Sequence, residues 1–388
     1  MKIRRTVSPA AAGIRLDSLV QPLRKASERT LVERRKDEIR QYFGVRHVYM
    51  VSSGKAALTL ILLALKSLRG GTKVLIPAYT CFSVPSSIVR AGMHIQLCDI
   101  DFETFDYDRN ILERSVDDET ACIVAIDLFG IPSNIERLRQ IGKRENIYII
   151  EDAAQAMGVH WEGEKLGARA DVGFFSLGRG KNITCGSGGI ILTDCGEIAN
   201  AIEKHLEDVE EMDFRDSLAN YLKTVAAFLF VNPRVYWVPS GIPSLRLGET
   251  FFCTDFPVKR LSWREAAILH GWRNTMEEWN EKRRENALYF MEALKPKLRC
   301  SPSIPYLRLP FLADTVEERD RISALSRERG LGVVRMYPSP VNEIPEIRDA
   351  FQEGNYPVSK YVADRLLTIP THPFLSDRDR EAICRLFH

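Results

Sequence analysis

The sequence predicts an α/β protein in which a mostly parallel, mixed sheet lies between helices, with a smaller α+β domain at the C-terminal end. Two observations support this prediction. Apolar runs of strand length alternate with segments of helix length over residues 46–195, which is typical of βαβ units. A chain of 388 residues is also long for one hydrophobic core. We therefore expect a large domain, residues 1–250, and a small domain, residues 251–388.

The individual elements follow from short-range patterns. Each predicted strand is a brief apolar run that ends at polar or turn residues; these runs are residues 46–51, 73–77, 95–101, 121–127, 147–150, 172–176 and 190–193. Apolar residues at helical spacing predict helices at residues 31–43, 58–68, 135–144, 261–294 and 317–329. Residues 1–30 have little pattern, so we expect an irregular N-terminal arm there.

The apolar run of residues 225–231 allows more than one interpretation. It is too short to span a bilayer. We expect a helix that is buried in the protein or in a dimer interface, and a helix on a membrane surface is the alternative. The acidic residues before this run are expected on a solvated helix face; they are Glu207, Glu210, Glu211, Asp213 and Asp216.

Composition and charge argue against several classes of protein. The formal net charge is +2 and no basic run is present, so nucleic acid is not an expected partner. Eight cysteines and seven histidines are scattered without metal-type spacing, which predicts no metal site and a reducing, cytoplasmic location. The basic N-terminus is not followed by the apolar segment of a signal peptide.

The residues with the clearest chemistry lie at strand ends. Glu151 and Asp152 follow the strand at residues 147–150, at the carboxyl end where open α/β sheets bind ligands. Lys181 follows later, in a loop between glycines. A carboxylate can hold a pyridinium nitrogen, and a lysine can form an imine with an aldehyde. Together they indicate pyridoxal 5′-phosphate (PLP) chemistry, which needs a free amine and therefore a lowered lysine pKa.

Two further motifs suit such a cofactor. Residues 52–58 place serines and a glycine at the start of a helix, where free backbone N–H groups suit a phosphate. A plain helix cap is the alternative. Residues 78–83 follow a strand and include aromatic side chains that suit a flat ring, although core aromatics under a loop fit equally well.

Taken in order, these segments resemble the DegT/DnrJ/EryC1/StrS family, the PLP-dependent sugar aminotransferases of fold type I in the aspartate aminotransferase superfamily. The resemblance covers about residues 38 to 385. Its motifs are residues 53–58, 77–80, 151–156, 175–176, 181–182, 186–189 and 366–373. It implies the PLP-dependent transferase fold type I and a homodimer with the active site between subunits.

The resemblance also implies roles for individual residues. Lys181 would bind the cofactor covalently and then move the proton between the substrate carbon and the cofactor. Asp152 would pair with the pyridinium nitrogen, which keeps the ring an electron sink. Gln155 would lie on the side of the ring's 3-oxygen. The residues implied at the phosphate are Ser53, Gly54, Lys55 and Ser176.

The sequence departs from the family pattern at several positions. Cys81 stands where the family usually has the aromatic that stacks on the ring, so either Phe82 or Tyr79 takes that role or the ring loses a neighbour. The other departures are Asp127 and Met157, where histidine is common, residues 177–180, and Val258, where an asparagine is common. They bear on the sugar and on the phosphate contacts more than on the rest of the PLP site.

We therefore predict an aminotransferase that takes an amino group from an amino acid, glutamate by family resemblance, and passes it to a nucleotide-linked keto-sugar. The pathway implied is cell-surface polysaccharide or amino-sugar biosynthesis. One alternative is a PLP enzyme of another type, a lyase or an acyl transferase. The other is a non-catalytic binding or regulatory member of the fold. The expected partners are small-molecule substrates and a second copy of the chain, without nucleic acid or a membrane span.

Overall fold

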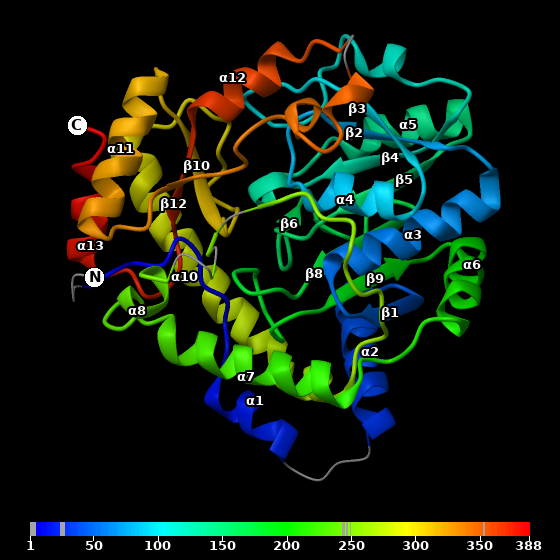
Figure 1. Cartoon of the computed structure of the whole chain (residues 1–388), viewed down its shortest axis with the longest axis horizontal. Coiled ribbons are helices and arrows are strands. Elements are labelled where there is room, and N and C mark those ends of the chain that lie inside the picture. The colour runs from blue at the N-terminus through cyan, green and yellow to red at the C-terminus, as the bar shows by residue number, and fades with distance from the viewer. Residues whose placement is uncertain (1–4, 24–27, 243–244, 246, 249, 352–353) are drawn as a thin grey trace.

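A computed structural model describes residues 5–23, 28–242, 245, 247–248, 250–351 and 354–388 (Figure 1). Its larger sheet has seven strands in the order β1-β9-β8-β5-β4-β2-β3. These strands are β1 (His47–Val51), β2 (Lys73–Pro77), β3 (His94–Cys98), β4 (Thr120–Ile126), β5 (Tyr148–Asp152), β8 (Val172–Ser176) and β9 (Gly189–Thr193). Neighbours are parallel except that β9 is antiparallel to β1 and β8. The carboxyl ends of all strands except β9 therefore lie at one edge of the sheet.

Successive residues of a strand point to opposite faces of the sheet. Both faces of this sheet carry buried apolar side chains, and helices cover both. Val74 belongs to the hydrophobic cluster that contains α3 (Gly54–Arg69), whereas Leu75 belongs to the cluster that contains α5 (Ile135–Glu145). The other helices near this sheet are α2 (Glu28–Phe43), α4 (Ser83–Arg90) and α6 (Gly196–Glu207). A two-stranded hairpin, β6 (His160–Trp161) and β7 (Glu164–Lys165), follows β5.

A smaller antiparallel sheet, in the order β10-β12-β11, lies among the C-terminal helices (Figure 1). Its strands are β10 (Arg308–Leu312), β11 (Val334–Arg335) and β12 (Leu366–Pro370). The helices of this region are α10 (Trp272–Leu294), α11 (Val316–Arg329), α12 (Pro357–Arg365) and α13 (Asp377–Cys384). The two sheets confirm the predicted fold class. The domain boundary near residue 250 stays a prediction.

The N-terminal segment differs from the irregular arm that we expected. Residues 16–20 form helix α1 (Leu16–Val20), and the 3-10 helix η1 (Gln21–Leu23) follows it. The hydroxyl of Tyr221 donates to the carbonyl of Leu19 at 3.0 Å. The backbone N–H of Val7 donates to the carbonyl of Gly330 at 2.8 Å. The expectation is wrong for residues 16–23, because contacts with distant parts of the chain stabilise a segment whose local pattern is weak.

The predicted helix of residues 261–294 is in fact two helices, α9 (Trp263–Ile268) and α10. Gly271 lies at the break with a φ of 66°, a left-handed conformation that glycine adopts without strain. Apolar residues keep helical spacing across the break, which explains why the pattern predicted one continuous helix.

The apolar run of residues 225–231 lies at the end of helix α7 (Phe214–Phe230), which is not buried in the described chain. Its buried residues are Ser217 and Thr224, whereas Leu229 is 58% exposed. Ser217 Oγ donates to Glu265 Oε2 at 3.1 Å and Asn220 Nδ2 donates to Glu265 Oε1 at 3.0 Å. Apolar side chains of α7 are only partly buried where they pack against the core; they are Tyr221, Val225 and Phe228. The expectation of a buried helix is therefore wrong, and the dimer interface stays a prediction.

The acidic residues near α7 are exposed as expected, but they do not share one helix face. They lie at the end of α6, in the following loop and in the first turn of α7; they are Glu207, Glu210, Glu211, Asp213 and Asp216. In the part of the chain that the structure describes, no helix combines the length and the apolar character that a membrane crossing requires.

Candidate active site

The predicted site residues come from segments that meet at the edge where the parallel strands end. Asp152 is the last residue of β5 and Ser176 is the last residue of β8. Ser53 follows β1 and caps α3. Lys181 lies in the loop from β8 to β9, and this loop begins and ends at the same edge. The topology therefore brings together residues from the different motifs identified in the sequence.

Asp152 and Lys181 lie close enough for each charge to affect the pKa of the other group. Asp152 is 7% exposed, and burial raises its pKa to about 6. The N–H of Ala154, which donates to Asp152 Oδ1 at 3.0 Å, and the charge of Lys181 both oppose that shift. Burial lowers the pKa of Lys181, against the charges of Cys81 and Asp152. A buried acid and an amine with a lowered pKa therefore occupy one site, as PLP chemistry requires.

The side chain of a buried arginine donates hydrogen bonds to the backbone of the Lys181 loop. Arg283 of α10 is 0% exposed and donates to the carbonyls of Lys181 and Asn182, each at 3.4 Å. It also donates to the carbonyl of Ala11 at 3.0 Å. Burial lowers the pKa of Arg283 to about 9. The sequence analysis missed this residue, because it lies in an ordinary charged helical pattern far from the loop.

Ser53, Gly54 and Ser176 form a cradle at the start of α3. The N–H of Ala56 donates to Ser53 Oγ at 3.0 Å, so this hydroxyl caps the helix. A Cβ on Gly54 would lie 2.9 Å from Ser176 Cβ, so glycine lets the two segments approach closely. The first N–H groups of a helix have no partner within it, and here they lie beside the Ser176 hydroxyl. The structure shows that Ser53 is a helix cap, and a phosphate site at this cradle stays a prediction.

The candidates for stacking on the cofactor ring have different surroundings. Cys81 is half-buried and lies near Lys181, whose pKa its charge affects. The side chain of Phe82 is 5% exposed and belongs to the hydrophobic core. Tyr79 is also buried, and its hydroxyl donates to the carbonyl of Met336 at 2.6 Å. Phe82 and Tyr79 are thus fixed by core contacts, whereas Cys81 is half-buried near Lys181.

Gln155 is held by a tyrosine that the sequence analysis missed. Its Nε2 donates to the hydroxyl of Tyr337 at 3.0 Å, and both side chains are buried. Tyr337 has a φ of 48°, in the left-handed region that residues other than glycine rarely adopt. Its ring contacts Tyr79 edge-on, with 5.8 Å between the centroids. Such strained, packed positions concentrate at functional sites.

Comparison with known proteins assigns the chain to a family. The model of the DegT/DnrJ/EryC1/StrS aminotransferase family matches residues 27–227 and 254–388. The chain belongs to this family. The assignment confirms the predicted family and the predicted enzyme class, an aminotransferase. The match does not cover residues 228–253.

Individual members of the DegT/DnrJ/EryC1/StrS family are distant relatives. A pleiotropic regulatory protein of Geobacillus stearothermophilus is 25% identical over 360 residues, which cover 91% of this chain and 87% of that protein. The UDP-2-acetamido-2-deoxy-3-oxo-D-glucuronate aminotransferase of Pseudomonas aeruginosa is 23% identical over 353 residues, with 90% and 88% covered. The structure of Spr1654 from Streptococcus pneumoniae in its PMP form superposes with a TM-score of 0.77 at 19% identity, covering 97% of each chain. This structural similarity confirms the fold.

One departure from the DegT/DnrJ/EryC1/StrS pattern has a matching partner in the structure. Asp127, at the histidine position, accepts a hydrogen bond from Arg169 Nη2 at 3.0 Å. Arg169 Nε also donates to Glu151 Oε1 at 2.7 Å. Burial raises the pKa of Asp127 well above its usual range, with the Glu151 charge acting in the same direction. This ion-pair network lies directly before Asp152 and helps to fix the end of β5.

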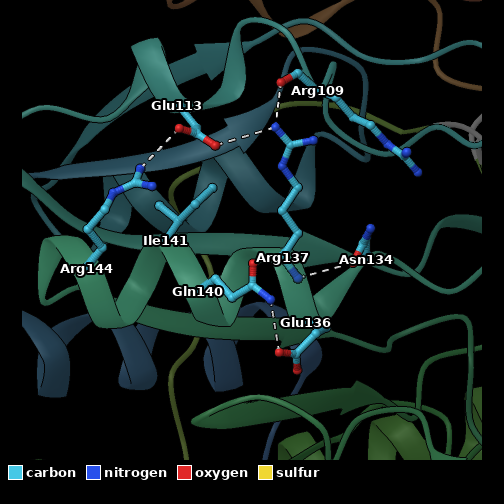
Figure 2. A pocket seen from close by; sticks show the side chains of 8 residues that line it. All are labelled: Arg109, Glu113, Asn134, Glu136, Arg137, Gln140, Ile141 and Arg144. Carbon is cyan, nitrogen blue, oxygen red and sulfur yellow. Dashed lines mark hydrogen bonds and ion pairs between the residues drawn. The ribbon is translucent and has the colours of Figure 1, made fainter.

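Two hollows in the described surface do not include the candidate site. Figure 2 shows one of about 370 Å³ along α5, where Arg137 and Arg144 flank Glu113 with ion pairs of 3.7 and 3.3 Å. Another, of about 960 Å³, lies between the loops that follow β3 and β4. Neither is lined by Asp152 or Lys181, so we do not assign the chemistry to these hollows.

Proposed function

We propose that this protein is a PLP-dependent aminotransferase that moves an amino group from an amino acid to a nucleotide-linked keto-sugar. The observation that carries the proposal is that the buried Asp152, at the end of β5, lies near the half-buried Lys181 in the loop from β8 to β9. The expected donor is glutamate, and the expected pathway is cell-surface polysaccharide or amino-sugar biosynthesis. The name of the Pseudomonas aeruginosa relative, an aminotransferase of a UDP-linked oxo-sugar, supports the sugar acceptor.

The residues at this edge of the sheet fit PLP. Asp152 is buried, and burial raises its pKa to about 6 although the charge of Lys181 offsets part of that rise. A pyridinium nitrogen would add a second cation. The cradle of Gly54 and Ser176 suits the phosphate. When bound, PLP supplies the aldehyde that accepts the amino group and a ring that stabilises negative charge on the substrate carbon. The PMP form of Spr1654 supports this cofactor.

The chain's own groups then have separate tasks. Lys181 Nζ, when uncharged, would move the proton from the substrate carbon to the cofactor in the first half-reaction and in the opposite direction in the second. Its lowered pKa increases the uncharged fraction near neutral pH. The carboxylate of Asp152 keeps the ring nitrogen charged. Arg283 holds the backbone carbonyl of Lys181, so the amine keeps its position while it transfers the proton.

The proposal is tested by loading purified protein with PLP and adding glutamate. We expect the absorbance of the aldehyde form to change to that of the amine form, and to return when a keto-sugar nucleotide is added. Lys181→Ala should abolish the change, whereas Lys143→Ala, at an exposed lysine of α5, should preserve it. If no amino donor changes the spectrum, transamination is refuted.

The alternatives would give different results. Without an amino acceptor, a lyase would release keto acid in large excess over the enzyme, whereas an aminotransferase stops after one equivalent per active site. A regulatory protein, as the name of the Geobacillus stearothermophilus relative suggests for that protein, would keep its biological activity in the Lys181→Ala variant. If the protein is an aminotransferase, it should not turn over without an amino acceptor, and the Lys181→Ala variant should lose its activity.

We further propose a cytoplasmic homodimer with the active site at the interface between subunits, and a domain boundary near residue 250. The apolar side chains exposed on α7 support an interface there; they are Phe214, Leu218, Leu222, Leu229 and Phe230. Size-exclusion chromatography with light scattering should give a dimer at micromolar concentration, and Leu222→Glu should weaken it. A monomer at that concentration would contradict the proposal.

A further inference from the structure

The first residues that the structure describes cross the molecule as an extended, buried segment. Residues 5–13 form no helix and belong to neither sheet, yet Val7, Ser8 and Ala11 are at most 3% exposed. In Figure 1 this blue segment runs from beside α13 toward α1. We call residues 5–13 the N-terminal strap. Because buried backbone groups need hydrogen-bond partners, a segment without regular structure must find them in other parts of the chain.

One end of the N-terminal strap is bound by the C-terminal region. Arg5 Nε donates to Asp379 Oδ1 of α13 at 3.0 Å. His372, which follows β12, has its Nε2 2.9 Å from the carbonyl oxygen of Ser8, and both residues are fully buried. Burial lowers the pKa of His372 to about 4, so the ring is neutral and donates from Nε2 to this carbonyl, which can only accept. These bonds fix residues 5–8 to the region around β12 and α13.

The other end of the strap contacts the loop that carries Lys181. Gly13 forms a parallel β-bridge with Ile183, two residues after the lysine. Ala10 Cβ lies 3.4 Å from the position that a Cβ on Gly180 would take, directly before the lysine. The strap therefore contacts the loop on both sides of Lys181.

Arg283 of α10 joins the strap to the same loop. Its Nη2 donates to the carbonyl of Ala11 at 3.0 Å and to the carbonyl of Lys181 at 3.4 Å. The strap also lies tightly against α10, because a Cβ on Gly13 would be 2.7 Å from Thr275 Cγ2. Glycine at this position thus lets the strap contact both the helix and the loop.

We propose that the N-terminal strap positions Lys181 by holding its loop against the region around β12 and α13. Gly178 and Gly180 give this loop a permissive backbone, so contacts from outside the loop are needed to fix it. Position matters, because a displacement of about 1 Å can cost a reacting group about 100-fold in rate. The strap acts through the loop, and its members are therefore positioning residues. The inference rests on the proposed function, because that function makes Lys181 the reacting amine.

The first test compares two strap variants with wild type by hydrogen–deuterium exchange, with and without PLP. Gly13→Ala displaces the strap through the contact with Thr275, and Arg5→Gln removes the ion pair with Asp379 without changing a buried residue. Backbone amides of residues 178–184 should exchange about tenfold faster in Gly13→Ala. They should exchange about 2- to 5-fold faster in Arg5→Gln, because a partly exposed ion pair contributes less.

The second test separates positioning from plain stabilisation of the fold. In PLP-loaded Gly13→Ala, the rate of the spectral change with glutamate, per bound cofactor, should fall about 10- to 100-fold. The half-saturating glutamate concentration should stay within about twofold of wild type. Deuterium at the α-carbon of glutamate should slow the variant more than wild type, because proton transfer by Lys181 becomes more limiting. A strap that only stabilised the fold would lower the melting temperature and leave the rate per bound cofactor unchanged.

Matched controls change the same residue types outside the strap. Arg15 pairs with Asp17 at 3.1 Å and its side chain is 48% exposed, so Arg15→Gln should behave as wild type. Gly196→Ala adds a Cβ in open space and should do the same. Circular dichroism of each variant reports whether it is folded, and Arg5→Gln decides the question if Gly13→Ala does not fold.

Each pattern of results has one meaning. Faster exchange in residues 178–184 together with a slower reaction supports the strap as a positioning element. The proposal is overturned if the folded strap variants exchange like wild type in that loop, or if exchange rises while the rate per bound cofactor and the isotope effect stay unchanged. If glutamate fails to change the spectrum of wild type but the strap variants still exchange faster in the loop, the proposed reaction fails while the hold of the strap on the loop stands.

Discussion

Replacing Asp152 by asparagine should stabilise the cofactor-free protein while impairing the cofactor site. Burial raises the pKa of Asp152 from its ordinary 3.8 to about 6. Ionising this carboxyl at neutral pH therefore costs the folded state about 3 kcal/mol, from about 1.4 kcal/mol for each pH unit between the two values. Asparagine has no charge to bury and can still accept the N–H of Ala154. Asp152→Asn should thus raise the free energy of unfolding of apoprotein by up to about 3 kcal/mol at pH 7.5.

The effect should depend on pH in a defined direction. A raised folded pKa means that the native state holds a proton that the unfolded state has lost between about pH 4 and pH 6. The stability contributed by Asp152 therefore falls as the pH rises through that window, and the full cost is present above it. At pH 5 the cost is about 1.6 kcal/mol, so the advantage of the variant should be about 1.4 kcal/mol smaller than at pH 7.5.

The assay is urea unfolding of wild type and variant without PLP at pH 5 and pH 7.5, followed by PLP titration at pH 7.5. The control is Asp349→Asn, at a carboxylate whose side chain is 88% exposed, which should change neither stability nor PLP binding. We expect the more stable Asp152→Asn variant to bind PLP more weakly and to lose the glutamate-dependent spectral change. A variant that is no more stable than wild type at pH 7.5, or that keeps full activity, would refute the reasoning.

Three more outcomes test the site. Gly54→Ala should weaken PLP binding about tenfold in a fluorescence titration, because over-packing costs about 1–3 kcal/mol, whereas Gly196→Ala, with open space around its Cβ position, should not. Tyr337→Phe should lower the free energy of unfolding by about 1–3 kcal/mol in urea, because the buried Gln155 amide loses its acceptor; an unchanged midpoint would count against that bond. The rate at which PLP enters apoprotein should rise with pH and level off below 10.5, because burial lowers the pKa of Lys181; a rise that continues past 10.5 would contradict this.

The central sheet and the main site motifs were predictable from sequence because their signals are local. The apolar run before Asp152 predicted β5, and the carboxyl-end rule predicts that ligands bind at the edge where β5 ends. Lys181 was recognisable because glycines and strands flank it in a characteristic order. Ser53 was recognisable as a helix cap, which the structure confirms, whereas the phosphate site beside it stays a prediction.

The residues that sequence analysis missed act over long separations. Arg283 contacts the Lys181 loop from a distant helix, and Tyr337 accepts a hydrogen bond from Gln155 across a long stretch of sequence. Neither lies in a recognisable motif, so three-dimensional proximity is their only signal. The exposure of α7 was also unpredictable, because an apolar run looks the same whether the chain itself or another molecule covers it.

The most direct test of the central claim identifies the lysine that binds the cofactor. Purified protein is treated with PLP and then borohydride, which fixes the linkage as a stable amine, and the digested peptides are sequenced by mass spectrometry. We predict a pyridoxyl group on Lys181. Lys55 is the main alternative attachment site for the cofactor, because burial lowers its pKa as well and it also lies near Cys81. A label on Lys55 or on a surface lysine, with Lys181 unmodified, would contradict the account.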